Sequence, residues 1–391
     1  MKNHPSLDIR IATDNSHKAR YRAVGFAMFV LVAGLLFARI LVSLFSMAIA
    51  NAVTSQTHRI IIDTLFSVLA QIGVCFFAVY IIYKIKLKYS AKQIFAYSNF
   101  NKTRWYNLAL AVPIAIAGVF VTIGVSALSS MFLALLGYNR PSGGSGDGLP
   151  VEFSAGLFIL QLFLVAVLPA ICEEFAMRGG LFNALKGSYK GGFFYVAMAL
   201  AFGLFHQNIT QFFYTALFGA VMAFVVVKTK SIYPVMIIHF INNAFSVYLS
   251  HAARYNWRFF GNLFTTIANG LVTDTFLVIA IYIAIVASLG GLLFLLHYLN
   301  SAKNLKAKKD VILSSGFDHT NNRIVIVGEL DNQKIKDLEL EKEVYGTDSF
   351  KTKKDLVPLY KPTLADNMYF IGAIVIAGSF TLFSFIWGLL Y

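Results

Sequence analysis

Four ionisable side chains of types used in peptide hydrolysis lie within long apolar stretches of the sequence. They are Glu173 and Glu174, which are followed by Arg178, and the histidines His206 and His239. A charge at the centre of a bilayer costs about 2.5–3.5 kcal/mol on insertion scales. We therefore expect these groups to be paired, neutralised or turned toward a water-containing cavity. The other histidines lie in loops or near the ends of apolar stretches.

The two adjacent glutamates are expected to have different roles. Neighbouring residues of an α-helix point about 100° apart. Glu174 and Arg178 are one helical turn apart with the acid first, which favours an ion pair that neutralises charge and braces the helix. Glu173 is left to face elsewhere, where a carboxylate removed from water suits a general base. Gly179 and Gly180 would let another helix approach closely.

Both deep histidines have a partner one helical turn away. Phe202 precedes His206, so its ring can pack against the imidazole. His239 and Asn243 share one helix face, and their N–H groups could donate to a developing oxyanion. Asn242 is expected on a different face.

The depth of each group can be estimated as its distance along the helix from the nearest inner basic residue. It is about 20 Å for Glu173, 24 Å for His206 and 14 Å for His239. These depths let all three meet in the inner half or middle of a bilayer. Each motif also has a purely structural interpretation, as interhelical hydrogen-bond partners or as a bracing ion pair. Arg39, in the first apolar stretch, is expected to reach toward lipid headgroups.

The composition indicates a membrane protein that does not bind nucleic acid. Hydrophobic residues make up 58% of the 391 residues and charged residues only 13%, against about 25% charged in soluble domains. The net charge of +14 comes from Lys and Arg beside the apolar stretches, as expected of topology determinants. Cys75 and Cys172, both in apolar stretches, imply neither a disulfide framework nor a metal cluster.

The predicted fold class is all-α, a polytopic membrane helical bundle of about nine transmembrane helices with a small polar inner-face segment. The expected spans are 23–52, 60–83, 105–138, 153–185, 192–207, 209–227, 231–250, 272–299 and 368–391. Lysine-rich loops all fall on one side if the N-terminus is cytoplasmic, whereas the Gly-rich loop 139–150 lies on the other. The sequence thus predicts a multi-pass cell-membrane protein with its C-terminus outside; an organellar or endoplasmic reticulum membrane is the alternative.

Five regions are expected. They are an N-terminal tail with two helices (1–104), a catalytic membrane core (105–250), an external loop and helix (251–299), a polar cytoplasmic segment (300–366) and a C-terminal helix (367–391). The polar segment is either a small subdomain or a disordered tether. It contains a strand-like run, Arg323 to Val327, and a charged run of helical character, Asn332 to Val344.

The motifs resemble those of the CAAX prenyl endopeptidase and bacteriocin-processing (CPBP, or Abi) family of intramembrane proteases. EExxxR, FxxxH and HxxxN occur in that order on three expected helices; they are Glu173, Glu174 and Arg178, then Phe202 and His206, then His239 and Asn243. The resemblance covers about residues 105–250.

The resemblance implies endoproteolysis in a helical bundle reached from the inner face. Glu173 with His206 would activate water, while His239 and Asn243 would stabilise the oxyanion. The substrate would be a peptide or membrane-associated protein, in peptide maturation or bacteriocin self-immunity rather than prenyl-protein processing. Its partners are thus that substrate and the lipid bilayer.

Metal dependence and catalysis itself are left open by the sequence. His206, His239 and Glu173 could hold Zn²⁺ with an open fourth position. A metal-free Glu–His base explains the same residues and is favoured, so no cofactor is expected. Two alternatives to a protease are a non-catalytic membrane scaffold or binding protein of the same family, and a proton-coupled transporter. The cleavage position and oligomeric state cannot be read from the sequence.

Overall fold

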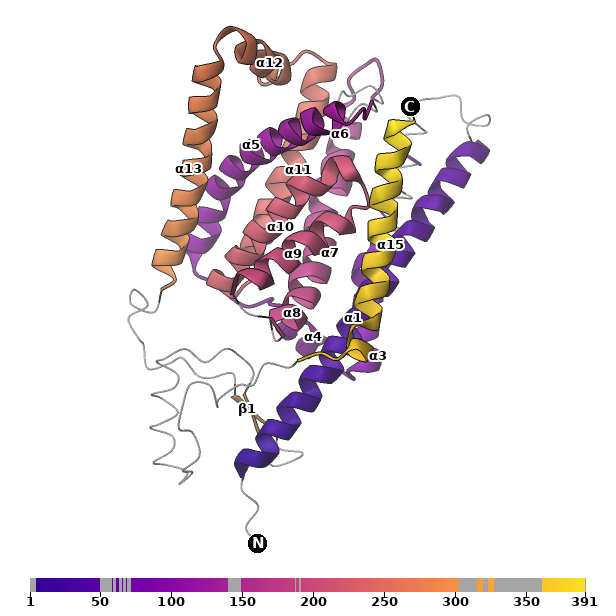
Figure 1. Ribbon diagram of the computed structural model, residues 1–391, viewed down its shortest axis with the longest axis vertical. Helices are drawn as coiled ribbons and strands as arrows, with labels where there is room; N and C mark the ends of the chain where they lie inside the picture. The colour runs from indigo at the N-terminus through magenta and orange to yellow at the C-terminus, as the bar shows by residue number, and fades with distance from the viewer. Residues whose placement is uncertain are drawn as a thin grey trace.

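The computed structural model describes residues 5–49, 58, 61, 62, 65, 68, 72–139, 149–186, 188, 189, 191–301, 315–318, 323–326 and 361–390. The described chain is almost entirely helical (Figure 1), which confirms the predicted all-α fold class. Several predicted features lie wholly or mostly outside the described residues: the Gly-rich loop, the run 332–344 and most of the polar segment.

The helices before the candidate site are α1 (Pro5–Ile49), η1 (Ile72–Ala78), α3 (Val79–Lys86), α4 (Ala91–Tyr97) and α5 (Trp105–Leu135). The central group is α6 (Ala155–Gln161), η2 (Leu162–Val167), α7 (Leu168–Glu174), η3 (Phe175–Leu181) and α8 (Phe182–Lys186). The remaining helices are α9 (Gly191–Phe205), α10 (Ile209–Thr229), α11 (Tyr233–Arg254), α12 (Leu263–Thr273), α13 (Thr275–Leu299) and α15 (Leu364–Leu389).

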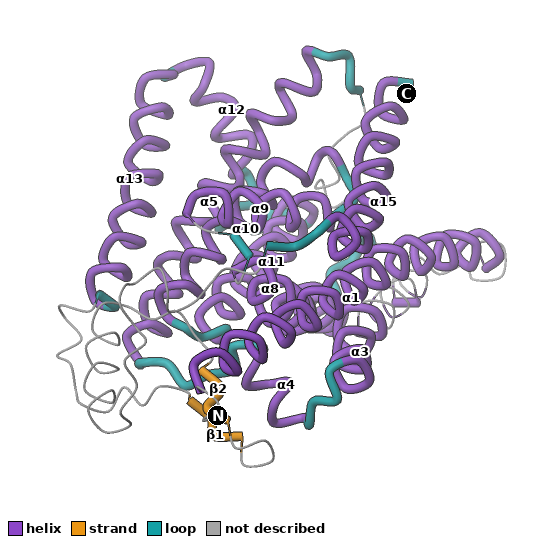
Figure 2. Tube along the Cα trace, turned by 60° about the horizontal axis from the view of Figure 1, so that its bottom comes forward, coloured by secondary structure: helices purple, strands orange, loops and turns teal. Residues whose placement is uncertain are grey.

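One small hairpin lies within the predicted polar segment. Strands β1 (Ser315–Asp318) and β2 (Arg323–Ile326) pair antiparallel, with Ser315 opposite Ile326. Figure 2 shows these strands at one end of the helical bundle. The strand-like run expected at Arg323 to Val327 is thus present as β2.

Among the described residues, six helical stretches are long and apolar enough to cross a membrane. They are Lys18–Phe45, Trp105–Leu135, Ala155–Lys186, Ile209–Thr229, Thr275–Leu299 and Leu364–Leu389. These establish a multi-pass membrane protein, while the count of nine stays a prediction. Helix α9 has only 15 residues, a length of about 22 Å, and the predicted span 60–83 is described only in part.

The first and last helices run side by side. Helices α1 and α15 pack along each other and run in the same direction (Figure 1). The start of α1 and the end of α15 therefore lie at opposite ends of the bundle. Two glycines allow this contact. A Cβ added to Gly25 would lie 3.1 Å from the ring of Phe370, and one added to Gly372 would lie 3.0 Å from the ring of Phe29. Which end faces the cytoplasm stays a prediction.

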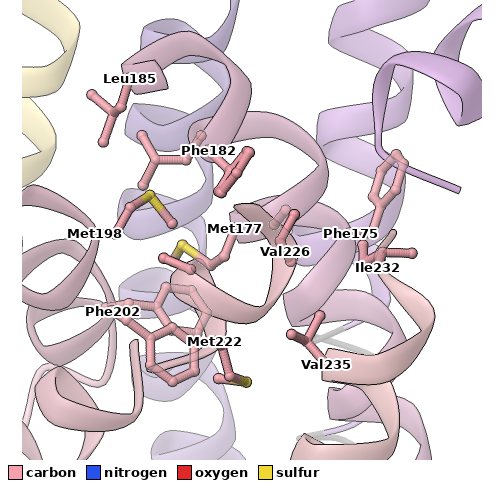
Figure 3. Packing of buried hydrophobic residues seen from close by; sticks show 14 of the residues in the cluster. Phe175, Met177, Phe182, Leu185, Met198, Phe202, Met222, Val226, Ile232 and Val235 are labelled. Carbon is pink, nitrogen blue, oxygen red and sulfur yellow. The ribbon is translucent and has the colours of Figure 1, made fainter. Parts of the chain in front are cut away.

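The helix formed by α6 to α8 is packed into the middle of the molecule. Figure 3 shows Phe175 and Phe182 of this helix among buried side chains from neighbouring helices, including Met198 of α9, Met222 of α10 and Val235 of α11. Lipid tails are as apolar as these side chains, so close van der Waals packing and interhelical hydrogen bonds hold membrane helices together. The part of this central helix from Cys172 to Phe182, which carries both glutamates, is therefore buried among its neighbours.

Candidate active site

The glutamates lie where the central helix changes its winding. Glu173 and Glu174 end α7, and the π-helix η3 begins at the next residue. In η3 the N–H of Phe182 donates to the carbonyl of Met177, five residues earlier. The carbonyl of Arg178, which an α-helix would have paired with Phe182, instead accepts a hydrogen bond of 2.7 Å from Nδ2 of Asn99. Such π segments are frequent at functional sites.

The expected ion pair of Glu174 and Arg178 is present in the core. Nη1 of Arg178 donates to Oε1 of Glu174 at 2.9 Å, and Nη2 donates to the carbonyl of Gly219 at 3.4 Å. Both side chains have no exposed surface (0%). A buried pair of this kind stabilises little in net terms, but losing one partner leaves a buried charge uncompensated.

Glu174 also binds His239, a contact that the sequence analysis did not anticipate. Oε1 of Glu174 lies 2.8 Å from Nδ1 of His239. This one oxygen of α7 therefore accepts hydrogen bonds both from Arg178 of η3 and from His239 of α11. A carboxylate only accepts hydrogen bonds, so the Nδ1 of His239 carries the hydrogen. The other ring nitrogen, Nε2, lies 3.9 Å from Oε2 of Glu173.

These four groups form one buried charged cluster. Glu173 is 6% exposed and His239 is 3% exposed. Two carboxylates and one guanidinium leave a net negative charge, which a single proton held by Glu173 or His239 would balance. The cluster thus brings carboxylate and imidazole groups together in an enclosed site, and these are group types used in general acid–base chemistry.

His206 lies in the turn after α9, which ends at Phe205, rather than inside the predicted span. Its Nδ1 lies 2.8 Å from the carbonyl oxygen of Phe202. A carbonyl only accepts hydrogen bonds, so Nδ1 carries the hydrogen and Nε2 of the neutral ring is a hydrogen-bond acceptor.

The ring of Phe202 lies among the charged and imidazole groups. Cζ of Arg178 lies 4.2 Å from the ring centroid. The centroids of His206 and His239 lie 5.0 and 6.0 Å away, with both imidazoles nearly perpendicular to the phenyl ring. The ring of Phe202 thus lies between His206 and the charged cluster on α7, η3 and α11. The guanidinium of Arg178 over this ring is an attractive cation–π contact.

Asn243 faces the helix that carries the glutamates. Its Nδ2 donates to the carbonyl of Val165 at 3.0 Å. Pro169, one turn later, has no N–H to donate to that carbonyl. Asn242, expected on a different face, donates to Oδ1 of Asn243 at 3.3 Å and accepts a hydrogen bond from Thr122 of α5 at 3.4 Å.

The turn that carries His206 is fixed by α1, which the sequence analysis missed. Nη2 of Arg39 donates to the carbonyl of His206 at 3.2 Å, and its Nη1 donates to Oε1 of Gln207 at 3.4 Å. Nε2 of Gln207 in turn donates to the carbonyl of Val32 at 3.1 Å. The expectation that Arg39 reaches toward headgroups is wrong, because its guanidinium hydrogen-bonds this turn.

The glycines after Arg178 permit close approach, as expected. A Cβ added to Gly179 would lie 2.7 Å from Cβ of Ser98, and one added to Gly180 would lie 2.5 Å from the hydroxyl oxygen of Tyr83. Helices α3 and α4 with the turn after α4 therefore pack directly against η3.

The three candidate metal ligands do not form an ion-binding group in the described structure. Within the part of the chain that the structure describes, no group of three or more His, Cys, Asp and Glu side chains could hold an ion. His206, His239 and Glu173 were the candidate ligands. The Nδ1 atoms of the two histidines are engaged with the Phe202 carbonyl and with Glu174, so only their Nε2 atoms would be available to bind an ion.

Residues 155–245 match the model of a family described as type II CAAX prenyl endopeptidase, Rce1-like. The match contains every predicted site residue and confirms the resemblance drawn from the three motifs. It is narrower than the predicted core of 105–250, and the predicted division into regions stays untested. Neither a curated protein nor a solved structure matches the chain.

Proposed function

We propose that the protein is an intramembrane endopeptidase that hydrolyses a peptide bond with water activated by Glu173 and His206. The observation that carries the proposal is the buried contact of Glu173 and Glu174 with His239, formed between α7 and α11. It lies within the segment that matches a protease family.

In the proposed reaction Glu173 takes a proton from water, and the water oxygen attacks the carbonyl carbon of the scissile bond. His206, whose Nε2 can accept, orients the same water. The tetrahedral oxyanion then collapses, the C–N bond breaks, and the proton passes from Glu173 to the leaving amine. The products are a free carboxylate and a free amine. General base catalysis of this kind contributes about 10²–10⁴-fold in rate.

His239 and Asn243 are proposed to stabilise the oxyanion. His239 is supported in this role because Glu174 fixes its Nδ1 and Nε2 lies 3.9 Å from Oε2 of Glu173. Nε2 would donate to the oxyanion when the imidazole is protonated. Asn243 would have to release the carbonyl of Val165 or share its amide group with the oxyanion. Arg178 and Phe202 support the site by neutralising Glu174 and by packing against both imidazoles.

The proposed substrate is a peptide or a membrane-associated protein, in peptide maturation or bacteriocin self-immunity. The proposed location is a cell membrane, with the N-terminus in the cytoplasm and the C-terminus outside. The reaction is proposed to need no metal, and Zn²⁺ stays an alternative to be tested.

The test compares peptide fragments in membranes that contain the wild type, Glu173→Gln or His206→Ala at matched abundance. Glu152→Gln is the matched control, since Glu152 is an exposed glutamate ahead of α6. We expect a set of fragments that is present with the wild type and the control and absent with both site variants. A chelator added to the wild-type membranes should leave this set unchanged.

Two results would count against the proposal. Fragments that are identical in all four membranes would remove the enzymatic function. Loss of folded protein in Glu173→Ala, with no effect on fragments when abundance is matched, would favour the non-catalytic scaffold.

A further inference from the structure

A cavity of about 340 Å³ lies directly beside the turn that carries His206. It is lined by Gln207 of that turn and by Phe380, Phe383, Ser384 and Trp387 of α15. Helix α15 lies outside the segment that matches the CAAX protease family. Most of the cavity wall therefore comes from α15, and only Gln207 comes from the segment that matches the family.

The walls of this cavity are held in place by hydrogen bonds. Oγ of Ser384 accepts a bond of 2.8 Å from the N–H of Ile209, which joins α15 to the start of α10. Gln207 is held from the opposite direction by Arg39 and by the carbonyl of Val32. The position of the cavity relative to His206 is thus fixed by both α1 and α15.

The lining indicates what the cavity would bind. Phe383 and Trp387 are 55% and 41% exposed, so the aromatic wall opens at the surface. The volume is at the lower end of the range of about 300–1,000 Å³ for small-ligand sites, a size that suits one large side chain. Arg39, which hydrogen-bonds the lining residue Gln207, has five N–H donors, and the described hydrogen bonds to His206 and Gln207 use two of them.

We propose that this cavity is a substrate subsite that binds a large apolar side chain of the peptide near the scissile bond. The proposal rests on the endopeptidase function and adds a specificity determinant to it. Because the cavity opens between α15 and the turn after α9, an extended segment can place its side chain on the aromatic wall. Its main-chain carbonyl groups can then accept hydrogen bonds from Arg39, while the next residues lie toward His206.

The experiment uses the full chain in native membranes and reads the sequences of the fragments. Cleavage sites are defined as those lost in Glu173→Gln. Phe383→Ala enlarges the cavity and Phe383→Trp reduces it. The matched control is Leu382→Ala, because Leu382 is also exposed on α15 (56%) and does not line the cavity.

We expect one position near the cleavage site to be enriched in large apolar residues in the wild type. Removing or adding a few methylene-sized groups in an apolar pocket changes discrimination about 10–200-fold. Phe383→Ala should therefore shift the preference at that position at least tenfold toward bulkier residues. Phe383→Trp should shift it toward smaller ones, and Leu382→Ala should leave it unchanged.

Two outcomes would overturn the subsite while leaving the endopeptidase intact. One is an unchanged residue preference in both Phe383 variants. The other is a uniform loss of all fragments without a change in preference, which would indicate a lipid chain or a purely structural role for the cavity. Survival of every fragment in Glu173→Gln would instead refute the endopeptidase function itself.

Discussion

Replacing Arg178 by methionine removes the guanidinium that is paired with Glu174. The variant Arg178→Met keeps much of the side-chain volume but leaves two carboxylates, Glu173 and Glu174, buried near each other. Breaking a buried pair by removing one partner costs about 3–5 kcal/mol. The stacking of the guanidinium on Phe202, at 4.2 Å, adds up to about 2 kcal/mol where both groups are desolvated.

The double variant Glu174→Gln with Arg178→Met separates the electrostatic cost from the packing cost. Glutamine can still accept the hydrogen bond from Nδ1 of His239, while the uncompensated charge is gone. We expect the single Arg178→Met variant to lose about 3–7 kcal/mol of unfolding free energy, from the ion pair and the stacking together, and the double variant to recover more than half of this loss.

The assay is reversible unfolding of the purified protein in mixed micelles, for the wild type, both single variants and the double variant. A coupling free energy of at least about 1.5 kcal/mol is expected for groups that share a buried ion pair. Additive losses, with the double variant less stable than Arg178→Met, would refute the assignment of this pair as the charge balance of the site.

Three further predictions concern the packing and positioning of the site. Gly179→Ala should lower the unfolding temperature because the new Cβ would lie 2.7 Å from Cβ of Ser98, whereas Gly290→Ala, which meets nothing within 4 Å, should not. Arg39→Met should lower fragment production about 10²-fold, the scale expected when a catalytic group is displaced by about 1 Å, with folded abundance unchanged in a protease-protection assay. Asn243→Ala should cost about 0.5–1.5 kcal/mol of unfolding free energy, measured as above, because it removes the hydrogen bond to the carbonyl of Val165.

The contacts within one helix could be predicted from the sequence. The i,i+4 spacing gave the pair of Glu174 and Arg178, and adjacent glycines gave the close approach at η3. The apolar stretches likewise predicted the long membrane helices and the all-α class.

The contacts between helices could not be predicted in the same way. That Glu174 binds His239 depends on how α7 crosses α11, and no local spacing encodes this. Arg39 reaches the turn after α9 across 167 residues of sequence. The carbonyls of Arg178 and Val165 accept hydrogen bonds from Asn99 and Asn243, near a π segment and a proline in a helix that hydropathy alone presents as regular.

The most direct test of the central claim is the yield of cleaved peptide from liposomes that hold equal amounts of folded wild type or Glu173→Gln. If the carboxylate of Glu173 is the base, glutamine should lower the cleavage rate at least 10²-fold while the unfolding temperature stays the same or rises. Cleavage at the wild-type rate by a correctly folded Glu173→Gln variant would contradict the account.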